Sequence, residues 1–434
     1  MRSEHYLSSR QGSYVPRAEA PTINRGATRP YAIVPPQQDG ADESAVGTVN
    51  RPLREAILDS TLREGEQFAG AYFSFEQQLT IVRLLDDIGV TFIEVPSPIA
   101  SPETGRMVQA LCELGLRAHV VAHVRCVEAD VEAALDTSVF GLNLFYGTSA
   151  ELRTFSHGRR IDQILADTVP LIRRIRAAGR YARFSAEDAF RSDLVDLLTV
   201  FDAIVEAGVQ RIGLPDTTGI ATPRQVERLV RLCAERYPDI GIEFHGHNDT
   251  GCAIANTVAA LEAGADCLDV TVLGIGERNG ITSLSGLIAQ LYIHHPELLA
   301  EYDLTQLAPL DHFVAECLNL AIPFNMPITA PSAFTHRAGV HTKAVLRNPS
   351  SYEVLDPGDF GLTRHIDVGS RFTGRYAVGH RAATLGLQLS DDEVCNLTQA
   401  LKERAEQGSL SQEEVDAFIH VWYQEKEGNL VWER

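Results

Sequence analysis

Two histidines separated by a single residue are the first pair in this sequence whose types and spacing could support chemistry. His245 and His247 lie in the run EFHGHND, which is typical of a β-strand, so both imidazoles would project from one face. Together with one carboxylate they would form a metal site that leaves positions open for water and substrate. Either Glu64 or Asp59 can supply that carboxylate. A pair of structural, hydrogen-bonded histidines is the alternative interpretation of the same spacing.

A second alternating row of polar residues predicts a site for an anion. Arg183 and Ser185 share one face of a predicted strand, and Glu187 continues the row. An arginine beside a hydroxyl suits the bidentate capture of a carboxylate. A structural ion pair between Arg183 and a glutamate is the alternative.

Two further groups are suited to act on oxygens and protons. Arg63 would stabilise a developing enolate or alkoxide oxygen, unless it forms a salt bridge with Asp59 or Glu66. His336 and His341 lie further along the chain, in the run FTHRAGVHTK. A histidine titrates near neutral pH and is a natural base for a weakly acidic C–H proton, although an isolated pair is more often structural.

The elements that must position these residues follow a repeating pattern, in which β-rich runs alternate with amphipathic helical runs. The predicted strands cover residues 56–62, 92–96, 117–123, 140–146, 181–186, 211–216, 240–247 and 267–274. The predicted helices between them cover residues 75–88, 161–178, 194–207, 224–237 and 253–263. Glycines that favour left-handed helix ends follow several helical runs, at Gly89, Gly115, Gly179, Gly208 and Gly264.

This alternation predicts a parallel sheet of the α/β class, because each helix carries the chain back for the next strand. Eight such units in about 240 residues match the size of a (β/α)₈ TIM barrel. In such a barrel, functional residues gather at the C-terminal ends of the strands, so the polar residues above would meet at one mouth. A doubly wound open sheet is the alternative, since a number of strands does not prove closure.

The chain divides into three predicted parts. Residues 1–50 are rich in Pro, Gly, Ser and Arg and are expected to form a flexible N-terminal tail. Residues 51–300 would form the barrel. Residues 301–434 would form a C-terminal appendage, a linker followed by an α-rich part in which Ser390 and Ser411 cap two helices.

Composition excludes several classes of protein. The 434 residues include 38 Lys and Arg against 58 Asp and Glu, and the resulting charge of −20 disfavours a nucleic-acid surface. No apolar run approaches the roughly 20 residues of a membrane-spanning helix. The 7 cysteines are scattered without a CxxC pair, which indicates a reducing compartment. The N-terminus lacks the apolar core of a secretory signal, so we expect a cytoplasmic protein.

Four longer runs closely resemble the homocitrate synthases, which belong to the 2-isopropylmalate synthase/homocitrate synthase (DRE-TIM metallolyase) family. These runs are DSTLREGEQ, RFSAEDAFRSDLVDLL, EFHGHNDTGCAIAN and GIGERNGIT. The resemblance implies a TIM barrel, a homodimer in which the C-terminal appendage crosses to the partner's active site, and a divalent metal (Mg, Mn or Zn). It also implies an acyltransferase that condenses acetyl-CoA with a dianionic 2-oxo acid in a Claisen reaction and hydrolyses the CoA thioester.

The resemblance also implies roles for individual residues, carried over by motif. The implied metal ligands are Glu64, His245 and His247. The implied substrate-binding residues are His123, Arg183, Ser185 and Thr217. The implied catalytic residues are Arg63, which polarises the reacting oxygens, and His341, Tyr352 and Glu187, which serve in proton transfer.

Departures from the usual homocitrate synthase pattern leave the acceptor acid open. Asn143 stands where an Asp is expected, and Thr218 stands where Val is usual. Homocitrate synthesis from 2-oxoglutarate is the main prediction. The alternatives are a specialised paralogue of antibiotic biosynthesis that uses oxaloacetate or a phosphono- or phosphinyl-pyruvate, and a 2-isopropylmalate or citramalate synthase. A metal-dependent C–C lyase of the same superfamily is a further alternative, as is a barrel that only binds a partner. The histidine-bearing segment 334–341 favours a synthase, because the lyases end soon after the barrel.

Overall fold

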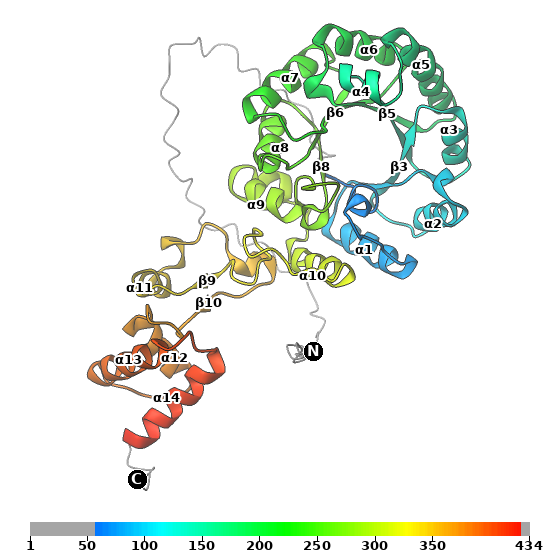
Figure 1. The fold of residues 1–434 in the computed structure, drawn as a ribbon. Coiled ribbons are helices and arrows are strands. Elements are labelled where there is room, and N and C mark those ends of the chain that lie inside the picture. The colour runs from blue at the N-terminus through cyan, green and yellow to red at the C-terminus, as the bar shows by residue number, and fades with distance from the viewer. Residues whose placement is uncertain (1–56, 427–434) are drawn as a thin grey trace, which may run out of the picture. The chain divides into compact units, whose positions relative to one another are not determined.

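The computed structural model describes residues 57–426, in which eight parallel strands close into a barrel inside a ring of helices (Figure 1). The strands are β1 (Ile57–Asp59), β2 (Phe92–Val95), β3 (His119–Arg125), β4 (Gly141–Gly147), β5 (Tyr181–Glu187), β6 (Arg211–Asp216), β7 (Gly241–Gly246) and β8 (Cys267–Val270). β1 pairs with β8 in parallel, with Leu58 opposite Asp269, and this pairing closes the sheet. The TIM barrel is therefore confirmed over the open sheet. The predicted tail over residues 1–50 lies outside the described residues.

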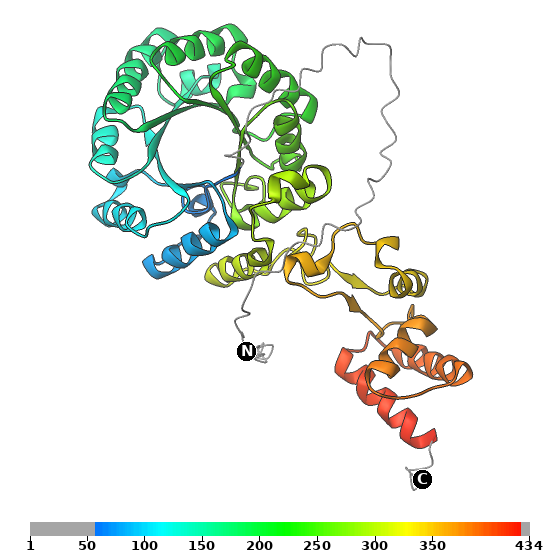
Figure 2. The same ribbon diagram turned by 180° about the vertical axis from the view of Figure 1, so that it is seen from behind.

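The helices of the barrel region cover the outer face of the sheet, as the view from behind also shows (Figure 2), except the short α4, which buries no residue. They are α1 (Phe75–Ile88), α2 (Pro102–Cys112), α3 (Glu128–Leu135), α4 (Ala150–Phe155), α5 (Ile161–Ala177), α6 (Leu194–Glu206), α7 (Pro223–Arg236), α8 (Ala253–Glu262) and α9 (Leu284–His294). The five predicted helices agree with α1, α5, α6, α7 and α8 within a residue or two. No predicted helical range covers α2, α3, α4 or α9. Of these, α3 and α4 are short, and the residues of α9 are buried almost all round.

Local signals set the ends of these helices. Ser74 caps α1 through a capping box with Gln77, and Gly89 ends the helix at a φ of 102°. The other glycines predicted as helix ends also have positive φ values: 70° at Gly115, 73° at Gly179, 97° at Gly208 and 108° at Gly264. A residue with a Cβ rarely adopts these angles, so each glycine fixes where the chain turns back toward the next strand.

The two faces of the strands have different chemistry. Side chains such as Ile93, Phe184 and Leu268 face the helices and belong to the main apolar core. The side chains that alternate with them face the barrel interior. At its N-terminal end this interior holds a small separate apolar cluster of Leu58, Phe92, Val121 and Cys267, called the floor cluster below. Buried charged and polar residues of the same strands lie above this floor.

The remaining residues form a further set of helices with a core of its own. α10 (Leu307–Cys317) packs against α1, and its apolar residues belong to the main core. The later elements are β9 (Thr335–His336), α11 (Gly339–Arg347), β10 (His365–Ile366), α12 (Arg375–Thr384), α13 (Asp391–Ala405) and α14 (Gln412–Lys426). Buried residues of α12, α13 and α14 form a second apolar cluster, and the α-rich C-terminal region is therefore confirmed. Ser390 and Ser411 cap α13 and α14 as predicted. The domain boundaries at residues 50 and 300 stay predictions.

Across residues 57–426, we find no helix with the length and apolar character that a bilayer crossing requires.

The second cluster allows a matched test of its packing. Val415 and Val421 lie on the same helix, but Val415 is fully buried in the cluster whereas Val421 is 41% exposed. We expect Val415→Ala to lower the free energy of unfolding of the C-terminal helices by about 2 kcal/mol, through lost apolar contact and a cavity. Val421→Ala should change it by less than about 0.5 kcal/mol. Urea titration followed by tryptophan fluorescence measures both, because Trp422 packs against this cluster. Equal effects of the two variants would contradict the assignment.

Candidate active site

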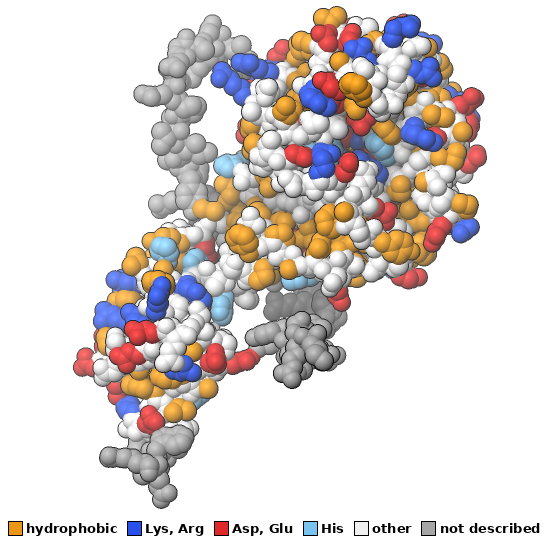
Figure 3. Space-filling view, in the orientation of Figure 1, with side chains coloured by type: hydrophobic (Ala, Val, Ile, Leu, Met, Phe, Trp, Pro, Cys, Tyr) orange, Lys and Arg blue, Asp and Glu red, His pale blue; other side chains and the backbone are white. Residues whose placement is uncertain are grey.

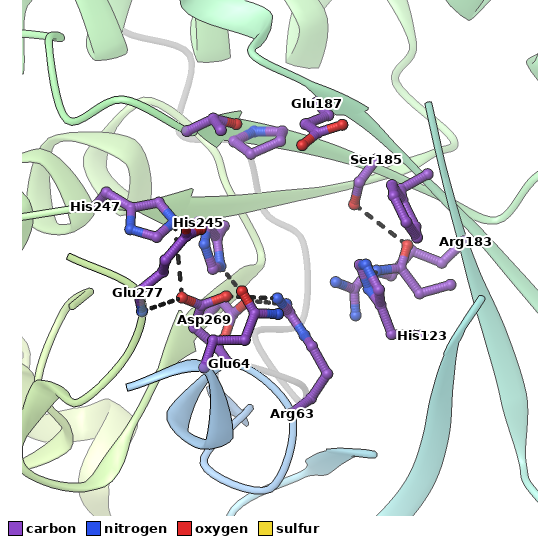
Figure 4. Close-up of a pocket in the computed structure, with 15 residues that line it drawn as sticks. Arg63, Glu64, His123, Arg183, Ser185, Glu187, His245, His247, Asp269 and Glu277 are labelled. Atoms are coloured by element: carbon purple, nitrogen blue, oxygen red, sulfur yellow. Dashed lines mark hydrogen bonds and ion pairs between the residues drawn. The ribbon is translucent and has the colours of Figure 1, made fainter. Parts of the chain in front are cut away.

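The C-terminal ends of the barrel strands surround one polar cavity of about 190 Å³ (Figure 4). Its lining includes these predicted site residues: Arg63, Glu64, His123, Arg183, Ser185, Glu187, Thr217, His245 and His247. The predicted residues that do not line it are His341 and Tyr352. The structure therefore brings together the predicted metal ligands and the predicted substrate-binding residues.

The three predicted metal ligands form a compact donor set. One donor atom each from Glu64, His245 and His247 lies within 4.8 Å of the others, and all three residues are buried. The Oε1 atom of Glu64 lies 3.9 Å from Nε2 of His247. Donors at these separations can converge on a cation with bonds of about 2.0 to 2.2 Å. The set has the two nitrogens and one oxygen of the predicted site.

Local contacts keep Glu64 ionised, as a metal ligand must be. Its Oε2 atom accepts a hydrogen bond of 2.7 Å from Arg63, and its Oε1 atom accepts one of 3.0 Å from the backbone amide of Glu277. Burial alone would raise the pKa of Glu64, but Arg63 and the two histidines lower it below its ordinary value.

The two histidines differ in their tendency to hold a proton. Burial alone would lower the pKa of His245, but Asp269, whose Oδ2 lies 2.6 Å from Nδ1, raises it above its ordinary value. A hydrogen on Nδ1 donates to Asp269, which leaves Nε2 as the nitrogen for a metal. Burial and the neighbouring His245 lower the pKa of His247 to about 4, so His247 is neutral at pH 7. Within residues 57–426, Nδ1 of His247 is buried without a hydrogen-bond partner. A divalent cation requires neutral imidazoles and an ionised carboxylate, so its binding would release any proton that His245 holds on Nε2.

Asp59, the alternative carboxylate, does not belong to this set. Leu58 faces the barrel interior in the floor cluster, so its neighbour Asp59 faces the opposite way. Asp59 accepts a hydrogen bond from the amide of Thr61, and burial raises its pKa to about 7. The geometry thus favours Glu64 as the carboxylate of the site.

Arg63 lies between the donor set and a buried acid that the sequence analysis did not select. Its Nε donates to Oε2 of Glu94 over 2.6 Å, and its Nη2 lies 3.8 Å from Asp269. Neither Asp59 nor Glu66 pairs with it, so the expected structural salt bridges are absent from the described contacts of Arg63. These contacts hold the guanidinium at the cavity wall, where it can stabilise negative charge on an oxygen.

The opposite wall of the cavity holds the predicted anion-binding residues. Nη2 of Arg183 lies 3.3 Å from Glu94 and also pairs with Glu243. Its Nε and Nη1 atoms are buried and have no hydrogen-bond partner among the described residues. The alternative interpretation of Arg183, an ion pair with a glutamate, is therefore confirmed for its Nη2 atom. Burial and the nearby Asp188 raise the pKa of Glu187, which also lines the cavity.

Asn143 lies among Glu94, His123 and Ser185. Its side-chain amide nitrogen donates to Glu94 over 3.0 Å and lies 2.9 Å from Nδ1 of His123. Its oxygen accepts from Ser185 over 3.2 Å. Nδ1 of His123 also lies 3.4 Å from Oε1 of Glu94, so an amide donor and a carboxylate acceptor both face this nitrogen. Burial and the charge of Arg63 lower the pKa of His123, which favours the neutral ring.

His341 and Tyr352 form a pair of their own in the C-terminal region. Their ring centroids are 4.4 Å apart, with an angle of 38° between the planes. Tyr352 is 50% exposed, and His341 on α11 is also exposed. Nearby, His336 contacts Glu353 at 2.7 Å, in agreement with a structural role for His336. The two predicted proton-transfer residues thus lie together but outside the cavity of their own chain.

Sequence reasoning missed three residues that organise the cavity: Glu94, Asp269 and, as a positioning residue, Asn143. Each is buried on a barrel strand and contacts a predicted site residue. The signal that could have found the two acids is a carboxylate at an inward position of a short apolar strand, FIEV for Glu94 and CLDV for Asp269. A buried acid of this kind needs charged partners, and those partners are the site residues.

Comparisons with known proteins agree with this geometry. An HMGL-like family model matches residues 54–314, and a model described as homocitrate synthase post-HMGL domain-like matches residues 328–409. The cytosolic homocitrate synthase isozyme of Saccharomyces cerevisiae is 46% identical over 370 residues, which cover 85% of this chain and 86% of that protein. This chain belongs to the homocitrate synthase family.

More distant members and solved structures extend the comparison. The homocitrate synthase of Sulfolobus acidocaldarius is 36% identical over 81% of this chain and 75% of its own length. The crystal structure of hydroxymethylglutaryl-CoA lyase from Pseudomonas aeruginosa matches with a TM-score of 0.55 at 20% identity, over 68% of this chain and 98% of that chain. At that identity the structural match shows the shared barrel fold alone. The match to the post-HMGL model shows that the C-terminal region also follows the homocitrate synthase family.

Asp269 provides a test of the donor set that does not need turnover. Asp269→Asn removes the negative charge that fixes the tautomer of His245, and we expect divalent-metal affinity to fall 10- to 100-fold with the fold intact. A competitive chelator titration measures this affinity. Asp311→Asn is the matched control, because Asp311 is equally buried but hydrogen-bonds to Ser285 and Thr329 instead. Equal metal affinity in the wild type and Asp269→Asn would contradict the donor set.

Proposed function

We propose that the chain condenses acetyl-CoA with 2-oxoglutarate and hydrolyses the CoA thioester, which is the homocitrate synthase reaction. The observation that carries this proposal is identity of 46% to a yeast homocitrate synthase over 85% of the chain. The cavity supports it, because a metal donor set and an arginine with spare donors line the same space.

The donor set supplies the first requirement of this chemistry, which is a polarised ketone. Glu64, His245 and His247 would hold a divalent cation such as Mg, Mn or Zn. When bound, such a cation acts as a Lewis acid on the carbonyl of the oxo acid. Arg63 faces the same region and would stabilise the oxygen on which negative charge develops.

The opposite wall would bind and orient the dianionic acceptor. Arg183, whose Nε and Nη1 atoms have no partner among the described residues, suits one carboxylate, and His123 suits the distal one. Ser185 and Thr217 would add hydroxyl contacts. Glu94 keeps Arg63 and Arg183 in place before the substrate enters, so little reorganisation accompanies binding.

Proton transfer completes the reaction. His341, assisted by Tyr352, would remove a methyl proton from acetyl-CoA, and the resulting carbon would bond to the ketone carbon of the acceptor. Glu187, whose pKa is raised, can hold or return a proton at the cavity wall. Water then adds to the thioester carbonyl, the C–S bond breaks, and CoA leaves as its thiol.

Because His341 and Tyr352 do not line the cavity of their own chain, we propose that they act in the active site of a second copy. The functional unit would then be a homodimer in which the C-terminal appendage crosses to the partner. We also propose a cytoplasmic location. The scattered cysteines favour it, while the yeast relatives include both a cytosolic and a mitochondrial form.

One observation favours a second candidate, a specialised paralogue that accepts oxaloacetate or a phosphono- or phosphinyl-pyruvate. Asn143 is neutral and lies against the residues that would receive the distal anion. A neutral amide tolerates a more highly charged or more compact acceptor than a carboxylate at that position would, because it adds no repulsion.

A panel of 2-oxo acids distinguishes these functions. Thiol release from acetyl-CoA is measured with 2-oxoglutarate, oxaloacetate, phosphonopyruvate, 2-oxoisovalerate and pyruvate. We expect the highest kcat/KM with 2-oxoglutarate. A higher value with oxaloacetate or phosphonopyruvate would establish the paralogue instead. Absence of thiol release with every acid, at saturating metal, would contradict a synthase.

The carboxylate ligand has its own matched pair of variants. Glu64→Gln removes a charged donor, so we expect turnover and metal affinity to fall by more than roughly 100-fold, beyond the range seen for outer contacts. Asp59→Asn changes the neighbouring buried acid, which faces away from the cavity, and should keep both quantities within about threefold. Retention of metal affinity by Glu64→Gln would refute the assigned ligand. Loss of metal affinity in Asp59→Asn, but not in Glu64→Gln, would identify Asp59 as the carboxylate ligand.

A further inference from the structure

Three cations surround one tyrosine ring in the C-terminal region. Nζ of Lys343 lies 5.1 Å from the centroid of the Tyr376 ring, and the guanidinium carbons of Arg347 and Arg375 lie 5.7 Å and 5.1 Å from it. These four residues are called the Tyr376 cluster below. In Figure 3, Lys and Arg side chains (blue) gather over the position that α11 has in Figure 1.

The fold holds this cluster in place. Lys343 and Arg347 are four residues apart, so they lie on one face of α11. Arg375 and Tyr376 begin α12. The two helices meet closely at Gly339 and Gly374, where a Cβ added at either glycine would lie within 2.8 Å of the other's Cα. The cations are thus brought together by the packing of two helices.

The described acids leave this cluster without an ion-pair partner. Among residues 57–426, we find no carboxylate in ion-pair distance of Lys343, Arg347 or Arg375. Other arginines of the same region are paired: Arg337 with Asp367, Arg364 with Glu353 and Arg381 with Asp416. In a chain with a net charge of −20, a group of cations without acids is an exception.

The electrostatics of the cluster favour an anion with several charges. Like charges this close repel one another, and a ring face offsets only about 0.5 to 1 kcal/mol for each exposed cation. The hydrogen bond from Arg375 and the charges of Lys343 and Arg347 lower the pKa of Tyr376. A bound polyanion would remove the repulsion. The overall charge of −20 repels long polyanions such as nucleic acid or an anionic bilayer, which leaves a small one.

We propose that the Tyr376 cluster binds the phosphate groups of acetyl-CoA, an inference that rests on the proposed function. The barrel cavity of about 190 Å³ is below the roughly 300 Å³ of small ligand pockets, so the nucleotide end of acetyl-CoA must lie elsewhere. The cations that line the cavity, Arg63 and Arg183, already contact the buried acid Glu94, so they are less suited to bind phosphate groups. The helix α11 carries both His341, the proposed base for the acetyl methyl group, and two cluster cations. Arg347 lies about 9 Å further along this helix axis than His341, so one helix would contact both ends of the donor.

Direct binding of adenosine 3′,5′-bisphosphate to the full chain tests the site without catalysis. We expect the double variant Lys343→Ala/Arg347→Ala to bind this probe at least tenfold more weakly than the wild type in calorimetry at low salt. The matched control is Arg224→Ala/Arg228→Ala, which removes two exposed cations at the same spacing on α7. Equal binding by wild type and the Lys343/Arg347 variant, or no binding by the wild type at millimolar probe, would overturn the proposal.

Kinetics with two acetyl donors gives a second measurement. The Lys343/Arg347 variant should have a KM for acetyl-CoA raised about tenfold, with unchanged kcat/KM for acetyl-pantetheine, which lacks the nucleotide. A proportional loss with both donors would overturn the proposal in favour of a structural or interface role. Loss of oligonucleotide or anionic-vesicle binding, with bisphosphate binding retained, would overturn it in favour of a macromolecular partner. If no donor supports turnover at all, the proposed function fails, while the bisphosphate measurement still decides the site.

Discussion

The carboxylate of Glu94 is the interaction on which the rest of the cavity depends. It is fully buried on β2, and it contacts Arg63 on one side and Arg183 and Asn143 on the other. Burial alone would raise its pKa, but Arg63, His123 and Arg183 hold the pKa of Glu94 well below its usual range. A charge removed from water is tolerated only with such partners, and loss of one partner typically costs about 3 to 5 kcal/mol. One acid therefore joins the metal-binding wall to the anion-binding wall.

The barrel makes this arrangement possible because strand alternation sends every second residue inward. Glu94, Arg183 and Asp269 occupy inward positions on β2, β5 and β8, while their neighbours Ile93, Phe184 and Leu268 contact the helices. The apolar side supplies the stability that a buried ionic layer does not. The parallel register also places Asn143 opposite both His123 and Arg183. The free-energy cost of the buried charges in the site is thus offset by apolar packing between the strands and the helices.

Much of this architecture could be predicted from the sequence. Alternating β-rich and amphipathic runs predicted the barrel, and the spacing of His245 and His247 predicted their convergence, because both signals depend on short-range periodicity. The choice between Glu64 and Asp59 could not be made, since it depends on which side of β1 each residue faces. Glu94 and Asp269 were missed because single acids within apolar strands carry no periodic signal. α9 was missed because it is buried almost all round, so its sequence does not alternate between an apolar and a polar face.

The floor cluster has a consequence for the order of events. Leu58, Phe92, Val121 and Cys267 fill the N-terminal end of the barrel interior, and the guanidinium of Arg211 covers the Phe92 ring at 5.2 Å. These side chains fill the N-terminal end of the described barrel interior, so ligands would reach the cavity from its C-terminal mouth. With acetyl-CoA placed above the 2-oxo acid, the proposed function has an ordered mechanism. The acid would bind before acetyl-CoA, and CoA would leave before the condensed acid.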